Sequence, residues 1–224
     1  MAAEIGATPV GGWNDEAQVE WYLKRLPNLA PRIPGEQMLA ELLPAEPQRM
    51  LDLGCGDGVL GRLALTHRAS LEEVISLDVS DAMLARARAA FSNEPRVTVI
   101  KHDLNQPLAQ IAGPFDVITS GFAIHHLADA RKKSLFAEVA SLLSEDGVFL
   151  NLDVVSSPTP RLHQDFLTAI GRTADDPEDQ LSSVSDQLAW LREAGFATAA
   201  SMWQWRGFAL LAAWPAWRTL PSGR

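Results

Sequence analysis

At 224 residues, 47% of them hydrophobic, the chain is long enough for one α/β domain with a sizeable core and a small cap. Its net charge of −9 disfavours a broad nucleic-acid surface, because such a surface requires a basic face. A single cysteine (Cys55), no signal-peptide pattern and no apolar stretch long enough to span a bilayer predict a cytoplasmic protein without membrane association.

After an N-terminal segment with one helical stretch at 36–43, strand-like and helix-like segments alternate. Strands are predicted at 50–53, 74–78, 97–102, 115–120 and 148–155, the last entered through a turn at 145–147. Helices are predicted at 61–68, 81–91 and 129–143, with Ser80 and Asp81 offering N-capping side chains. This alternation predicts a parallel sheet with crossover helices.

The last third of the chain breaks the alternation. Residues 156–182 carry prolines, acids and one short helical pattern at 162–171, so they are predicted to be an insertion. A helix at 185–194 follows. Two strands at 197–205 and 208–214 are separated only by Arg206 and Gly207, and so tight a connection requires antiparallel pairing.

The segment 50–60, MLDLGCGDGVL, combines a buried strand with a glycine-rich turn. Gly54, Gly56 and Gly58 allow backbone to lie directly against a ligand. A dinucleotide loop requires glycine at the position of Val59, and Asp52 suits a ligand that carries an ammonium group better than a pyrophosphate. The stretch resembles motif I of the class I S-adenosylmethionine-dependent methyltransferases.

The resemblance covers 48–215 and implies a Rossmann-like, seven-stranded α/β sheet, mostly parallel, with an antiparallel terminal hairpin and helices on both faces. It further implies an N-terminal helical cap at 1–47 and a methyltransferase domain at 48–224, whose insertion at 156–182 lies on the substrate side. The cofactor is expected to be S-adenosylmethionine.

Further cofactor-binding residues follow the carboxyl ends of the predicted strands. Asp78 is expected to bind the two ribose hydroxyls, since Ser80 and Asp81 already serve as helix caps. Val79 and Met83 flank it and would hold the adenine, although a core position suits Met83 equally well. The resemblance implies that Asp103 and the amide of Leu104 recognise adenine, and the alternative is that Asp103 caps a turn. The methionine portion is expected at Ser120 and Gly121, and Cys55 is expected to be a small apolar filler.

Two adjacent histidines, His125 and His126, follow the fourth predicted strand. A neutral histidine there can accept a proton from the methyl acceptor, and the alternative is that the pair caps the next helix and lines the pocket. No metal ion is expected, because adjacent histidines do not readily share one and Asp153 is without a second carboxylate. The candidates for contact with the acceptor are Trp13, Trp21, Tyr22, His163 and Phe166, and the alternative for each is plain packing.

The sequence therefore predicts methyl transfer from S-adenosylmethionine to oxygen, nitrogen or carbon of a small organic acceptor, by a monomer or homodimer. Alternatives are a tRNA- or protein-directed methyltransferase, which the acidic charge disfavours, and a cofactor-binding module without activity. A nicotinamide-dependent oxidoreductase is disfavoured by Val59 and by the terminal hairpin.

Overall fold

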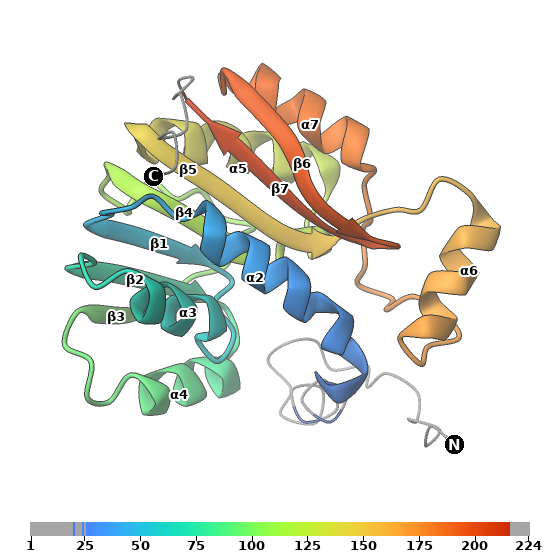
Figure 1. Ribbon diagram of the computed structural model, residues 1–224, viewed down its shortest axis with the longest axis horizontal. Helices are drawn as coiled ribbons and strands as arrows, with labels where there is room; N and C mark the ends of the chain where they lie inside the picture. Colours follow the sequence, from blue (N-terminus) through green and yellow to red (C-terminus); the bar gives the residue numbers. More distant parts are fainter. Residues whose placement is uncertain (1–19, 21–23, 25, 216–224) are drawn as a thin grey trace, which may run out of the picture.

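Seven strands form one sheet in the order β3-β2-β1-β4-β5-β7-β6 (Figure 1). This computed structural model describes residues 20, 24 and 26–215. The strands are β1 Arg49–Leu53, β2 Glu73–Asp78, β3 Val97–Lys101, β4 Phe115–Gly121, β5 Leu143–Val154, β6 Thr198–Trp205 and β7 Phe208–Trp214. The helices are η1 Leu26–Arg32, α2 Ile33–Leu42, α3 Val59–His67, α4 Asp81–Ala90, η2 Ile124–His126, α5 Asp129–Leu142, α6 Pro160–Ala169 and α7 Val184–Glu193.

The pairing confirms the predicted fold class. Strands β1 to β5 pair in parallel, and β7 runs antiparallel to both β5 and β6. The connection between β6 and β7 is two residues long, and Arg206 adopts a positive φ of 51° there. The strand order reverses direction between β1 and β4, and ligands bind at such a switch point in open parallel sheets.

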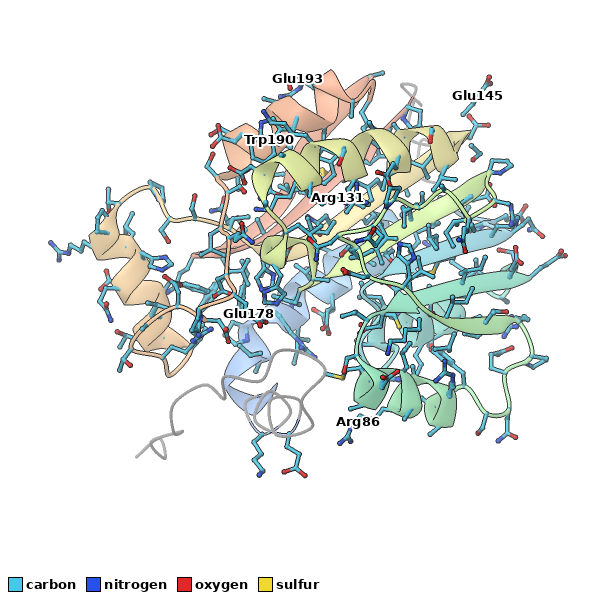
Figure 2. The ribbon with its side chains drawn as sticks, turned by 180° about the vertical axis from the view of Figure 1, so that it is seen from behind. Arg86, Arg131, Glu145, Glu178, Trp190 and Glu193 are labelled. Atoms are coloured by element: carbon cyan, nitrogen blue, oxygen red, sulfur yellow. The ribbon has the colours of Figure 1, made fainter. Side chains whose placement is uncertain are left out.

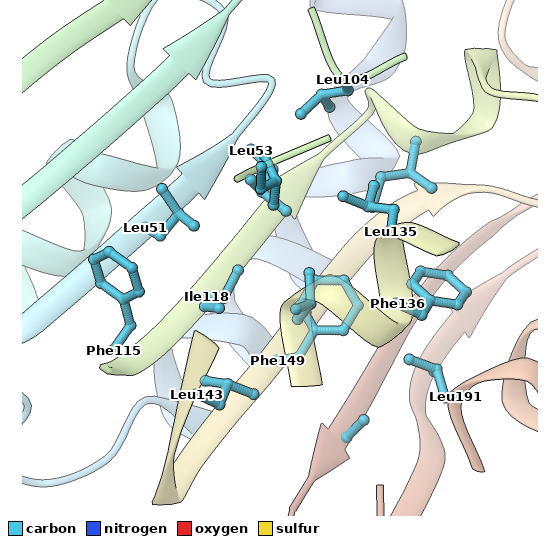
Figure 3. Close-up of a cluster of buried hydrophobic side chains, with 14 of the residues drawn as sticks. Leu51, Leu53, Leu104, Phe115, Ile118, Leu135, Phe136, Leu143, Phe149 and Leu191 are labelled. Atoms are coloured by element: carbon cyan, nitrogen blue, oxygen red, sulfur yellow. The ribbon is translucent and has the colours of Figure 1, made fainter. Parts of the chain in front are cut away.

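Helices cover both faces of the sheet. Helices α2 and α3 pack on one face through an apolar cluster that includes Leu39, Leu60 and Ala64. On the other face α5 and α7 lie side by side, and Phe136, Leu191 and Phe149 join them to the strands (Figure 3). Helix α6 lies beyond the end of the sheet, away from both layers (Figure 1).

The entry to β5 differs from the predicted turn. The strand begins at Leu143, which pairs with Phe115, and its register shifts before Val117 pairs with Val148. The segment 145–147 is thus an irregularity inside a strand. Gly147 packs so closely on the Phe115 carbonyl that a Cβ there would lie 2.9 Å from its oxygen.

Within the described part of the chain, none of the helices has the length and apolar content needed to cross a membrane.

Candidate functional site

The glycine turn after β1 forms the floor of a site at the carboxyl ends of the strands. Gly54 has a φ of 68°, and a Cβ there would lie 2.2 Å from Cβ of Ala123. Gly56 has a φ of 56°, and nothing lies within 4 Å of where its Cβ would be. Both conformations favour glycine, and the second position faces open space. The backbone at Gly56 is therefore exposed to a ligand.

A cavity of about 490 Å³ lies over this turn. Its walls come from the ends of β1, β2, β3 and β4 and from the loop after α6. The lining residues are Gly54, Gly56, Asp78, Val79, Met83, His102, Asp103, Leu104, Asn105, Gly121, Phe122, Ala123, His126, Leu127, Glu178 and Gln180. Outside the glycine turn and β1, seven residues at separate strand ends are predicted to bind the cofactor. The structure brings six of them together in the lining of this cavity. The exception is Ser120.

Asp78 is held rigidly at the end of β2. Its Oδ2 accepts a hydrogen bond from the amide of Gly56 and its Oδ1 one from the amide of Ser80, both at 2.8 Å. Each carboxylate oxygen has two lone pairs, so both oxygens can still accept from a diol. Burial raises the pKa of Asp78, and the amide of Ser80 opposes that shift. Helix α4 is capped by the Ser80 hydroxyl, which accepts from the amide of Met83.

The loop after β3 carries Asp103 and Leu104 along the same cavity. Oδ1 of Asp103 accepts from both the amide and the side-chain nitrogen of Asn105, at 2.9 and 3.0 Å. Arg131 on α5 fixes the loop from behind, because its guanidinium donates to the Leu104 carbonyl at 2.6 Å (Figure 2). An ion pair with Glu138 on the same helix holds Arg131 in place.

A smaller cavity of about 60 Å³ adjoins the glycine turn and is lined by Asp52, Cys55 and Gly121, together with Arg32 at the end of η1 and Glu36 in the first turn of α2. Oδ1 of the fully buried Asp52 accepts from the Thr119 hydroxyl at 2.8 Å, whereas Oδ2 has no hydrogen-bond partner. Burial raises the pKa of Asp52 to about 7, against the effect of the Thr119 hydrogen bond. A cation next to Oδ2 would stabilise the ionised carboxylate.

A third cavity of about 70 Å³ lies on the far side of Phe122 and His126, which also line the large cavity. One wall is apolar, with Phe122, Phe166 and Phe208 in edge-to-face contacts. The other wall is polar and comes from His125, His126 and the segment 172–182, which we call the strap. Arg172, Asp175, Asp176 and Asp179 are the strap residues that line it.

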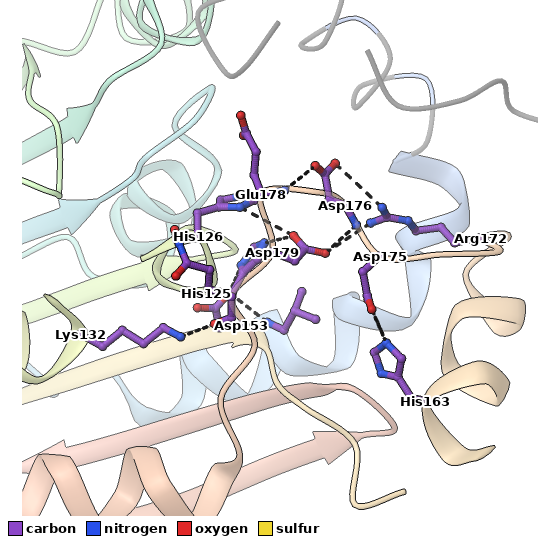
Figure 4. A network of polar contacts seen from close by, with 12 residues as sticks. His125, His126, Lys132, Asp153, His163, Arg172, Asp175, Asp176, Glu178 and Asp179 are labelled. Carbon is purple, nitrogen blue, oxygen red and sulfur yellow. Dashed lines mark hydrogen bonds and ion pairs between the residues drawn. The ribbon is translucent and has the colours of Figure 1, made fainter. Parts of the chain in front are cut away.

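The two histidines have different surroundings (Figure 4). His125 is buried, and its Nδ1 lies 2.5 Å from Oδ1 of Asp153 on β5. Burial lowers the pKa of His125, but the charge of Asp153 and the hydrogen bond to it outweigh burial, so the net shift is upward. Burial and the adjacent His125 lower the pKa of His126 well below its usual value. His126 is therefore neutral near pH 7.

The remaining predicted residues divide between packing positions, the pocket wall and undescribed parts of the chain. The buried Ser120 donates its hydroxyl hydrogen to the Leu53 carbonyl at 2.9 Å, so it ties β4 to β1 and lines none of the three cavities. Gly58 directly precedes α3 as its N-cap residue and packs on Phe91. Phe166 lines the third cavity, whereas His163 pairs with Asp175 at 2.8 Å outside it. Trp13, Trp21 and Tyr22 lie outside the described residues.

Sequence reasoning does not identify several residues around the cavities. Asp153, which has no second carboxylate near it in the sequence, contacts the lining residue His125, which lies 28 residues earlier. Glu178, Gln180 and Asp179 come from the strap, where the sequence has no local pattern that points to the cavities. Phe122 borders all three cavities, and its place directly after Gly121 is the one signal that could have identified it.

Comparison with known proteins finds methyltransferases. Residues 50–147 match the model of a methyltransferase domain. The uncharacterized methyltransferase YcgJ of Bacillus subtilis is 32% identical over 143 residues, which cover 63% of this chain and 54% of that protein. The trans-aconitate 2-methyltransferase of Acidovorax sp. is 31% identical over 163 residues, covering 70% of this chain and 57% of that protein. The chain thus spans little more than half the length of these relatives.

Among solved structures, an O-methyltransferase family protein from Burkholderia thailandensis superposes with a TM-score of 0.71 at 18% identity, covering 89% of this chain and 60% of that one. This likeness concerns the fold. Residues 50–147 are therefore similar to a methyltransferase domain, and the described sheet has the fold of the solved O-methyltransferase family protein.

Proposed function

We propose that this protein transfers the methyl group of S-adenosylmethionine to a small organic acceptor, at oxygen, nitrogen or carbon. The observation that carries the proposal is that the large cavity and the third cavity share Phe122 and His126. A cofactor in the first and an acceptor in the second would therefore meet at these two residues. Methyl transfer needs this apposition more than it needs acid–base groups, since the cofactor carries the activated methyl.

In this proposal the cofactor follows the strand ends. Asp78 would bind the ribose, and Val79, Met83, Asp103 and Leu104 would enclose the adenine. The carboxylate of Asp52 and the backbone at Gly54 and Gly121 would face the ammonium group of the methionine portion. Helix α2, through Arg32 and Glu36, would close the smaller cavity from the N-terminal side, which is the role expected of a cap.

The acceptor would occupy the third cavity, against Phe122, Phe166 and Phe208. Three carboxylates in the opposite wall make a polyanionic acceptor a poor electrostatic match, so we favour a neutral or cationic molecule with an apolar face. Where the acceptor must lose a proton, the neutral His126 is the histidine that borders both cavities.

Calorimetry and a labelled methyl donor test the proposal. S-adenosylhomocysteine should bind with one site per chain, and NAD⁺ should not bind. With S-adenosylmethionine labelled in its methyl group, the label should enter small acceptors carrying hydroxyl or amine groups. Label transfer to tRNA or protein instead would support the alternative classes, and binding of S-adenosylhomocysteine with no transfer to any acceptor would support the silent module.

A further inference from the structure

The side chains of His125, His126 and Asp179 converge on one point in the wall of the third cavity (Figure 4). One ligand atom from each lies within 4.8 Å of the other two. We propose that these three residues bind a first-row divalent cation, with Zn²⁺ as the type. The argument rests on three features of the cluster: its spacing, its orientation and its surroundings.

The spacing is too long for hydrogen bonds and suitable for an ion. Oδ1 of Asp179 lies 3.5 Å from Nε2 of His125 and 3.7 Å from Nδ1 of His126. Hydrogen bonds between nitrogen and oxygen fall at about 2.7–3.2 Å. Ligand atoms about 2.0–2.1 Å from a tetrahedral zinc ion lie roughly 3.3–3.4 Å from one another. The two distances from Asp179 lie within a few tenths of an ångström of that value.

The orientations of His125 and Asp179 are each fixed by a second contact. Nδ1 of His125 is hydrogen-bonded to the carboxylate of Asp153. A carboxylate on one ring nitrogen of a histidine orients the other ring nitrogen toward a metal ion. Oδ2 of Asp179 accepts from the amide of Asp176 at 3.0 Å and lies 3.8 Å from Arg172, which leaves Oδ1 turned toward the two rings. The adjacent histidines both reach the same point because they sit in the tight turn η2, with ring centroids 3.9 Å apart.

The backbone keeps the two halves of the cluster together. The amide of Gln180 donates to the His125 carbonyl at 2.8 Å, and its side chain donates to the His126 carbonyl at 3.1 Å. The ligand from the strap is therefore held against the ligands from η2. Asp175 and Asp176 add negative charge to the same wall, which favours a cation despite Arg172.

Two histidines and one carboxylate leave a fourth coordination position, as in sites where zinc meets a substrate. The third cavity lies on that side, so an oxygen or nitrogen atom of the acceptor could occupy the position. This last consequence rests on the proposed methyl transfer, whereas the metal site does not.

The test uses Co²⁺ as a spectroscopic probe on the full chain, prepared without an affinity tag and freed of metal with a chelator. We expect one equivalent of Co²⁺ to produce the intense visible absorption of a tetrahedral site and Zn²⁺ to displace it. Asp179→Asn and His126→Ala should each weaken binding at least tenfold. His163→Ala is the matched control, since it removes a histidine paired with another strap aspartate, and it should leave Co²⁺ affinity unchanged.

S-adenosylhomocysteine binding, followed in the same samples, reports whether each variant is folded and separates the two proposals. Absence of a Co²⁺ band in a wild-type protein that binds S-adenosylhomocysteine overturns the metal site alone. A Co²⁺ band that is unchanged in a folded Asp179→Asn variant also overturns the metal site. Should Asp179→Asn fail to fold, Asp153→Asn replaces it, with an expected 10–100-fold loss of Co²⁺ affinity.

Discussion

Two carboxylates at neighbouring strand ends, the buried Asp52 and the partly buried Asp78, differ in what their oxygens contact. Asp78 receives one backbone amide on each oxygen, so its orientation is fixed before any ligand arrives. Asp52 receives the Thr119 hydroxyl on one oxygen and leaves Oδ2 without a partner. An unpaired buried acceptor is costly, and a bound ammonium group would relieve that cost. The two residues therefore lead to different predictions about ligand binding.

Replacing Asp78 with alanine should weaken S-adenosylhomocysteine binding by about 1.5–3 kcal/mol, the range for hydrogen bonds to a charged group. Calorimetric titration measures this directly. Asp81→Ala is the control, because Asp81 is exposed and pairs with Lys101 at the surface, and its affinity should match the wild type. Unchanged affinity in the Asp78 variant would show that Asp78 does not bind the ribose.

From the raised pKa of Asp52 we predict that protons are released when the cofactor binds. Its pKa is about 7 in the free protein, and a cofactor ammonium group would favour the ionised form, so binding near pH 7 should expel a fraction of a proton. Affinity should accordingly fall as the pH is lowered below 7. Calorimetry in buffers of different ionisation enthalpy measures the released protons.

The Asp52→Asn variant should bind without proton release, and adenosine, which lacks the ammonium group, should bind the wild type without it. Release that persists in the variant would assign the proton to another group. The same raised pKa affects folding: the protonated form stabilises the native state, so this contribution is present below about pH 4 and is lost as pH rises toward 7.

At the scale of elements, the strap is attached to the body of the protein by a buried lysine on α5. The side chain of Lys132 is 1% exposed and donates to the Gln180 carbonyl and the Ser182 hydroxyl, with Asp129 at 3.3 Å. No other cation of α5 reaches the strap in the contacts of the described residues. Lys132 thereby holds in place the segment that supplies one wall of the third cavity.

Lys132→Met should lower the free energy of unfolding by about 1.5–3 kcal/mol, because it leaves buried acceptors without their charged donor. Chemical denaturation gives the value. The neighbouring Lys133 is exposed and lies 5.1 Å from the centre of the Trp190 ring, so Lys133→Met should cost less than about 1 kcal/mol. Equal losses in the two variants would contradict the role given to Lys132.

At the scale of the whole molecule, helix α2 joins the start of the chain to the far half of the sheet. Gly35 makes this close packing possible, since a Cβ there would lie 2.8 Å from both Leu152 on β5 and the Trp203 ring on β6. Arg32 and Glu36 sit beside it and line the smaller cavity. The fit of this helix on the sheet thus affects both stability and the proposed cofactor site.

Gly35→Leu should destabilise the protein by about 1–3 kcal/mol through overpacking and should also weaken S-adenosylhomocysteine binding, because α2 would be displaced from the cavity. Denaturation and calorimetry measure the two effects. Gln37→Leu introduces the same side chain at an exposed position of the same helix and should change neither by more than about 0.5 kcal/mol. Normal affinity in a destabilised Gly35 variant would separate α2 from the cofactor site.

Local patterns in the sequence were sufficient for the sheet and for the glycine turn. Strand periodicity, the two-residue hairpin connection and the glycines at 54 and 56 each act over a few residues, through side-chain alternation and backbone sterics. The fold class, the strand and helix positions and the match to the methyltransferase domain confirm that reading. The turn predicted at 145–147 was wrong. These residues lie inside β5, where Gly147 packs against the carbonyl of Phe115, which is distant in the sequence.

Only the tertiary structure decided which polar side chains meet around the histidines. Asp153 and Asp179 lie 28 and 54 positions after His125, and neither has a local pattern that predicts the contact. Ser120 faces a neighbouring strand, although its sequence position suggested the cofactor. Contacts between side chains that are far apart in the sequence depend on which side chains are buried together and on how the strap packs against the rest of the protein. The sequence by itself therefore determined the fold and the glycine turn, and the tertiary structure decided which polar side chains line the third cavity.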